Sequence, residues 1–284
     1  MSVEASGATA AIHAAGPVRE PGSRARRSTR FVLPIYTGMV IVYLMLPILV
    51  MILYGFNDSS PKRVSFTWEG FTTQWYVHLF AIPDLTTAIK NSLFIATVST
   101  IIATILGTLM GLALVRYRYR GRQSTDFVLF MNIAAPEIVL GASLLSLFVT
   151  LGVPRGILTI VIAHVMFNIA YVAITVRARL SGFDRSVEEA AQDLGAGPFA
   201  TFTRVTLPLI WPGVLAGALL AFALSIDDFI ITNFNAGSVV TFPLWVYGAV
   251  KLGIPPQVFV MGTLIFMGGA VIAVVNVLAQ RRKN

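Results

Sequence analysis

Residues 157–176 read ILTIVIAHVMFNIAYVAITV, an apolar run of twenty residues that contains no lysine, arginine, aspartate or glutamate. A helix of this length is about 30 Å long, which matches the hydrocarbon core of a bilayer. A helix at the surface of a soluble domain would instead carry a continuous polar face. The run therefore predicts a helix that spans a membrane.

Similar apolar runs lie on both sides of this one along the chain. Together they give six predicted spans, at residues 31–54, 88–115, 127–151, 157–176, 212–234 and 258–279. The composition agrees, because 56% of the 284 residues are hydrophobic and only 12% are charged, about half the charged fraction of a soluble domain. The predicted fold class is an all-α membrane protein with about six transmembrane helices.

The basic residues predict the orientation of these spans. Sixteen of the 21 lysines and arginines fall in segments that a cytoplasmic N-terminus would place inside. Such an inside excess sets topology, so both termini are predicted to be cytoplasmic. Residues 1–30 are predicted to be a disordered cytoplasmic tail, 31–280 the membrane domain and 281–284 a second tail. The first run is longer than a signal-peptide core and lacks a cleavage site, which favours an uncleaved span.

The composition also excludes several classes of function. The chain contains no cysteine, and its three histidines are scattered, so neither disulfides nor a metal cluster is expected. No phosphate-binding glycine loop and no nucleophile–base set is present, so we expect neither ATP binding nor a catalytic site in this chain. Topology explains the net charge of +8 better than nucleic-acid binding does.

Acidic residues inside the predicted spans are candidates for function, because a charge in a bilayer is costly. The fifth span carries Asp227 and Asp228, and the third carries Glu137 directly after Pro136. Apart from Lys90, at the start of the second run, no lysine or arginine lies within the six runs to pair with them. Unpaired acids in a pore favour a cationic substrate or a proton. Two alternatives stay open: the aspartates could cap a helix break, and Glu137 could mark the irregularity at Pro136.

Other polar and small residues in the spans give further predictions. His164 and Asn168 share one helix face and are expected to form hydrogen bonds between helices. The small-residue pairs Gly107/Gly111 and Gly213/Gly217 predict close helix packing. Trp75 and Tyr247, in or next to the outer loops, are candidates for cation–π contact with a substrate. The outer segment 235–256 is rich in glycine and proline and is predicted to be irregular.

The inner segment 177–210 is polar yet patterned. Residues 188–194 have good helix composition and are followed by Gly195, a helix-stopping glycine. A second amphipathic piece at 199–207 is expected to stop at Pro208 and Pro212. Two short helices beneath the membrane would form a docking surface for another protein.

This inner segment resembles the EAA loop of ABC importer permeases. That motif is E-A-A, three residues, G, nine residues, I or V, one residue and L-P. The chain matches it at Glu189, Ala190, Ala191, Gly195, Val205, Leu207 and Pro208. The resemblance implies that the loop docks on an ATPase subunit, with Glu188 and Asp193 beside the matched positions as further candidates.

A wider resemblance covers residues 31–280. The stretches 68–76, 116–121, 136–139, 225–228 and 247–253 are similar to the spermidine/putrescine uptake family of type I ABC importer permeases. The resemblance implies a heterodimer with a related permease, two ATPase copies that bind ATP and Mg, and an extracytoplasmic binding protein. It also implies a polyamine substrate and a bacterial inner-membrane location, with Asp227, Asp228, Glu137, Trp75 and Tyr247 along the substrate path.

Three alternatives to this interpretation stay open on the sequence. Related permeases carry other solutes, such as ferric ion, sulfate or opines. A proton-coupled secondary transporter of a cation would use the same acids, although it would show inverted repeats. A membrane scaffold without transport would explain the spans but not the acids within them.

Overall fold

The structure is a computed structural model, and it describes residues 24–59, 67–182 and 184–281. Most of these residues are helical, and among them no strand occurs beyond a single antiparallel bridge between Asn57 and Phe71. The chain divides into two units, Met1–Val50 and Met51–Asn284. Residues 1–23 of the predicted tail, 60–66 of the outer loop and 282–284 lie outside the described residues.

The first unit contains most of helix α1 (Arg24–Tyr54). Its side chains from Val32 to Leu46 are exposed and apolar on every face, as expected for a helix that lipid surrounds. The helix begins at Arg24, ahead of the predicted start at residue 31.

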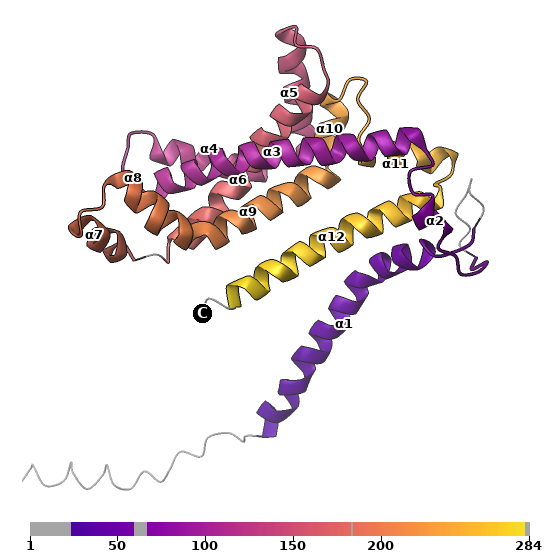
Figure 1. Cartoon of the computed structure of the whole chain (residues 1–284), viewed down its shortest axis with the longest axis horizontal. Helices are drawn as coiled ribbons and strands as arrows, with labels where there is room; N and C mark the ends of the chain where they lie inside the picture. Colours follow the sequence, from indigo (N-terminus) through magenta and orange to yellow (C-terminus); the bar gives the residue numbers. More distant parts are fainter. Residues whose placement is uncertain (1–23, 60–66, 183, 282–284) are drawn as a thin grey trace, which may run out of the picture. The chain divides into compact units, whose positions relative to one another are not determined.

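The second unit holds the remaining helices (Figure 1). They are α2 (Gln74–Val77), α3 (Pro83–Arg116), α4 (Arg122–Ala134), α5 (Glu137–Thr150), α6 (Ile157–Leu180), α7 (Ser186–Asp193), α8 (Pro198–Thr201), a π-helical turn (Phe202–Thr206), α9 (Leu207–Asp227), α10 (Ile230–Asn235), α11 (Phe242–Leu252) and α12 (Pro256–Arg281).

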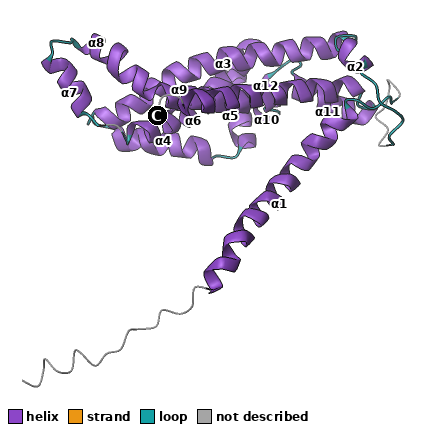
Figure 2. Cartoon of the chain, turned by 60° about the horizontal axis from the view of Figure 1, so that its bottom comes forward, coloured by secondary structure: helices purple, strands orange, loops and turns teal. Residues whose placement is uncertain are grey.

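Helices α3, α6 and α9 lie side by side and form the centre of this unit (Figures 1 and 2). Glycines allow the close approach: a Cβ atom on Gly107 would lie 2.7 Å from the Val172 Cβ, and one on Gly213 would lie 2.6 Å from the Arg179 Cβ. The packing predicted from the small-residue pairs is confirmed. Apolar residues of all three helices fill the contact, including Leu112, Val176 and Ile210.

The number of spans agrees with the prediction when one bent pair of helices is counted as a single span. Five described helices are long and apolar enough to cross a membrane, and a sixth span is present if α4 and α5 count as one. These two helices meet at 109° at Ala135–Pro136. Pro136 cannot donate a backbone hydrogen bond, and it disfavours helical geometry in the residue before it.

Two local predictions were wrong. The segment after Gly197 is no separate amphipathic helix, because α8, the π-helical turn and α9 run on from Pro198 to Asp227 through both prolines. In the π-helical turn the Leu207 N–H donates to the Phe202 carbonyl, a widened turn directly before Pro208, whose nitrogen has no hydrogen to donate. The outer segment 235–256 likewise contains a regular helix, α11.

Candidate functional site

The helix break at Asp227 and Asp228 is the first part of the candidate site. Helix α9 ends at Asp227, the backbone of Asp228 is extended, and α10 begins at Ile230. The Asp228 carboxylate accepts hydrogen bonds from the Thr232 N–H at 2.7 Å and the Thr232 hydroxyl at 2.6 Å. It also accepts a longer one from the Ile231 N–H. Asp228 therefore caps α10, as the capping alternative expected.

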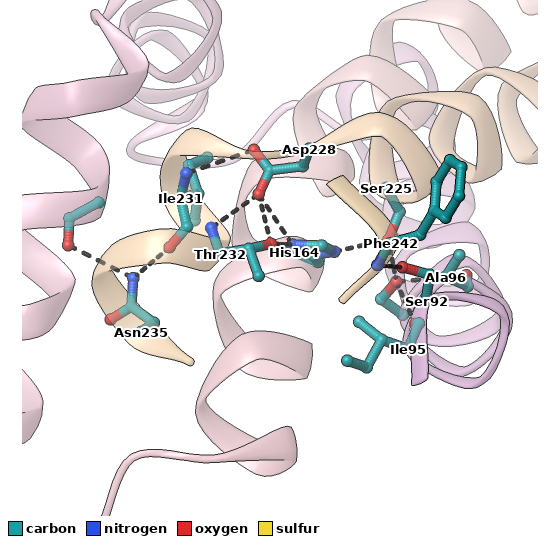
Figure 3. A network of polar contacts seen from close by, with 12 residues as sticks. Ser92, Ile95, Ala96, His164, Ser225, Asp228, Ile231, Thr232, Asn235 and Phe242 are labelled. Carbon is teal, nitrogen blue, oxygen red and sulfur yellow. Dashed lines mark hydrogen bonds and ion pairs between the residues drawn. The ribbon is translucent and has the colours of Figure 1, made fainter. Parts of the chain in front are cut away.

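His164 of α6 completes a buried polar network around this cap (Figure 3). Its Nε2 lies 3.2 Å from Asp228 Oδ2 and 2.9 Å from Thr232 Oγ1, and its Nδ1 lies 2.6 Å from Ser225 Oγ. Ser225 Oγ in turn lies 3.0 Å from Ser99 Oγ on α3. The side chains of His164 and Asp228 are only 3% and 5% exposed. The predicted interhelical role of His164 is confirmed; Asn168 is fully buried, and its side-chain atoms have no hydrogen-bond partner among the described residues.

Ser225, His164 and Asp228 have the residue types of a hydrolytic triad, but their surroundings exclude that chemistry. A nucleophilic serine must reach a substrate carbonyl. Ser225 is 5% exposed, and its hydroxyl lies between His164 and Ser99 inside the bundle. The network joins helices instead.

Asp227 lies in a different environment from its neighbour. Its side chain is exposed and lines a cavity of about 590 Å³ between α9, α11 and α12. Tyr247 lines the same cavity, with its ring centroid 4.7 Å from that of Phe229. The other lining residues are apolar, so Asp227 supplies the single charge among the described residues of this cavity. A carboxylate beside aromatic faces is suited to a cationic amine.

Two other predicted path residues lie elsewhere. Glu137 opens α5 directly after the bend; it is exposed and near enough for the charges of Asp227 and Asp228 to act on it. Trp75 is 6% exposed, and its indole N–H donates to the Asn57 carbonyl at 2.8 Å. Neither residue lines the cavity at Asp227.

The EAA segment forms the second part of the candidate site. The Asp184 carboxylate accepts a hydrogen bond from the Ser186 N–H ahead of α7, and this contact lowers the pKa of the carboxyl. The helix ends at Asp193, and Gly195 follows two residues later with a left-handed φ of +87°. The Ala196 N–H then donates back to the Ala191 carbonyl at 3.0 Å. The predicted turn at Gly195 is thereby confirmed.

The two glutamates of α7 lie in different environments. Glu188 is buried, where it forms an ion pair with Arg116 of α3 and accepts a hydrogen bond from the Thr206 hydroxyl. Glu189 is exposed. The remaining predicted contact residues are exposed or half-buried: Ala190, Ala191, Asp193, Gly195, Val205, Leu207 and Pro208. Of the two glutamates, Glu188 thus binds within its own chain, and Glu189 presents its carboxylate to the surroundings.

Comparisons with known proteins agree with this geometry. Residues 103–284 match the family described as binding-protein-dependent transport system inner membrane component. The chain belongs to this family. It is 38% identical to the spermidine/putrescine transport system permease protein PotC of Escherichia coli K12, over 86% of this chain and 92% of that protein. It is 42% identical to the putrescine transport system permease protein PotI of the same organism, over 78% and 81%.

Solved structures support the same fold. A bacterial ABC transporter involved in the import of the acidic polysaccharide alginate matches with a TM-score of 0.63 at 19% identity, over 92% of this chain and 98% of that one. The methionine ABC transporter MetNI matches with a TM-score of 0.55 at 16% identity, over 70% and 93%. The predicted type I ABC importer permease fold is confirmed. This permease subunit is a multi-pass protein of the bacterial inner membrane, and the family match does not favour the proton-coupled alternative.

Sequence reasoning missed the residues that hold this permease together at both ends. The sequence identifies Arg116 only as an inner basic residue and as part of the stretch 116–121, whereas in the structure it binds Glu188. Ser225 and Thr232 were not singled out, although both surround His164. Their signal is weak, because isolated hydroxyls are common in membrane helices and only the tertiary packing selects these two.

Proposed function

We propose that this permease forms half of the pore of an ATP-driven importer for polyamines such as spermidine and putrescine. The observation that carries the proposal is the exposed Asp227 carboxylate in a cavity lined by Tyr247 and Phe229. Polyamines are flexible polycations, and one carboxylate with aromatic faces binds an ammonium group loosely enough for release. Two relatives named as polyamine permeases, PotC and PotI, support the same substrate class.

The energy for transport is supplied from outside this chain in our proposal. A related permease completes the pore as a heterodimer, two copies of an ATPase subunit bind ATP and Mg, and an extracytoplasmic binding protein delivers the substrate. Helix α7 docks on the ATPase, with Glu189 and Ala190 exposed toward it. Closure of the ATPase pair moves α7 and thereby opens the pore outward. The match to a binding-protein-dependent family supports this division of labour.

Uptake of radiolabelled spermidine and putrescine tests the proposal. Cells that lack this chain are complemented with the wild type or with Asp227→Asn, and the rates are corrected for the amount of inserted protein. We expect uptake to require the chain and Asp227→Asn to raise the KM for both polyamines about tenfold, the effect of one lost charge-assisted contact. Equal uptake with and without the chain would refute the substrate class. The purified chain alone should not hydrolyse ATP.

A further inference from the structure

Asp227 and Asp228 are chemically identical neighbours in contrasting environments. Asp227 is exposed in the cavity, whereas the Asp228 side chain is 5% exposed. Asp228 Oδ2 already accepts hydrogen bonds from the Thr232 N–H and hydroxyl and lies 3.2 Å from the His164 Nε2. Asp228 does not line the cavity, so Asp227 is the carboxylate that a substrate there can contact directly.

We infer that Asp228 is a positioning residue, which together with His164 fixes the break between α9 and α10 so that Asp227 faces the cavity. This inference rests on the proposed function, because it assigns the roles within that site. Asp228 acts through the backbone and not on the substrate. Its partner His164 lies on α6 and is joined through Ser225 to Ser99 on α3, so two helices outside the break hold it in place.

The bilayer explains why the break needs such an anchor. Residues 229–234 read FIITNF, which is apolar enough to continue α9. A break leaves the first N–H groups of α10 without helical partners, and lipid offers none. The Asp228 carboxylate accepts from two of these groups, those of Ile231 and Thr232. Without this acceptor, an unbroken helix would give these backbone N–H groups hydrogen-bond partners that the broken helix lacks. Asp227 would then lie in the middle of a helix and its side chain would point in a new direction.

The role depends on hydrogen bonding and not on charge. Asparagine at position 228 keeps a carbonyl oxygen for the Thr232 and His164 donors and gives up only the longer contact with the Ile231 N–H. Leucine has a similar size and accepts nothing. At position 227, by contrast, asparagine removes the charge that attracts an ammonium group. The same Asp→Asn change at adjacent positions therefore separates the two roles.

The experiment measures spermidine uptake kinetics for Asp227→Asn, Asp228→Asn, Asp228→Leu and the double variant Asp227→Asn/Asp228→Leu, per inserted protein. We expect Asp228→Asn to keep the KM within about twofold and Asp228→Leu to raise it about tenfold, as Asp227→Asn does. The double variant should be no worse than either single variant, because both remove one interaction. Thr232→Ser should keep the wild-type KM and Thr232→Val should raise it, which supplies the test if Asp228→Leu does not insert.

Two outcomes would overturn the inference. If Asp228→Asn raises the KM as much as Asp227→Asn does, the negative charge of Asp228 interacts directly with the substrate. If Asp228→Leu and Thr232→Val both leave the KM unchanged, the break does not position Asp227. An unchanged KM in Asp227→Asn alone would instead contradict the proposed substrate site, so the two failures are distinguishable.

Discussion

Each end of the permease carries a pair of adjacent acids. In both pairs one acid is bound within the chain and the other is exposed. At the EAA end, Glu188 is bound within the chain and Glu189 is exposed. At the opposite end of α9, Asp228 is bound and Asp227 is exposed. Successive residues of a helix point about 100° apart, which separates Glu188 from Glu189, whereas the extended backbone at Asp228 separates it from Asp227.

The buried members of the two pairs differ in their partners. Glu188 faces the guanidinium of Arg116, a permanent cation, at a position where both side chains keep some exposure to the surroundings. Asp228 is more deeply buried and relies on His164 and Thr232, which are donors without a permanent charge. A full charge loses little hydration at the end of the bundle, so an ion pair is stable there. In the interior of a membrane the desolvation cost of a charge is larger, which favours hydrogen bonding over ionic pairing.

The exposed member of the EAA pair offers the largest expected effect. Glu189→Arg reverses the charge that α7 presents to the proposed ATPase surface, so uptake should fall more than about tenfold while the chain still inserts. Glu189→Gln keeps the size of the side chain and should retain more activity. Uptake assays with quantified membrane protein check both variants. Undiminished transport in Glu189→Arg would contradict the proposed docking of this face on the ATPase.

A glycine at the opposite end should show the largest effect on stability. Gly237 has a φ of +61°, and a Cβ atom there would lie 2.7 Å from the Arg155 carbonyl oxygen. Gly237→Ala adds left-handed backbone strain to a clash with backbone, about 3 kcal/mol together. Thermal unfolding in detergent measures the loss. Gly248→Ala is the matched control, because no atom lies within 4 Å of its new Cβ and its φ is negative.

Breaking the ion pair of Glu188 should have a smaller effect. Arg116→Met leaves Glu188 buried without its cation, which should cost about 2 kcal/mol after allowance for the partial exposure of both side chains. The double variant Arg116→Met/Glu188→Leu should recover most of this loss, because no charge is then left unpaired. Arg118→Met, at an exposed arginine of the same stretch, is the control. Equal unfolding temperatures for Arg116→Met and Arg118→Met would show that the pair does not anchor α7.

The sequence predicts the spans, the EAA turn and the position of the acids within the spans well, because each depends on local composition. A run of twenty apolar residues requires a membrane whatever the rest of the chain does. A left-handed turn requires glycine at one position, and Gly195 is that position.

Tertiary partners decide what the sequence cannot predict. Asp227 and Asp228 look equivalent in the sequence, and the contact that distinguishes them comes from His164, 64 residues before Asp228. Glu188 looks like a docking residue until Arg116 pairs with it. Pro208 normally stops a helix, yet the π-helical turn before it allows the helix to continue. In each case the deciding contact joins residues that are remote in sequence or changes the local helical geometry.

The smallest predicted effect belongs to Gly195, the counterpart of Gly237 at the EAA end. Both glycines have left-handed backbones, but a Cβ atom on Gly195 would have no atom within 4 Å. Gly195→Ala therefore adds backbone strain alone, about 1 kcal/mol. Gly195→Asn should cost less, because asparagine tolerates this conformation. Unfolding in detergent compares the two variants with Gly237→Ala; an equal loss at both ends would mean that crowding at Arg155 contributes nothing.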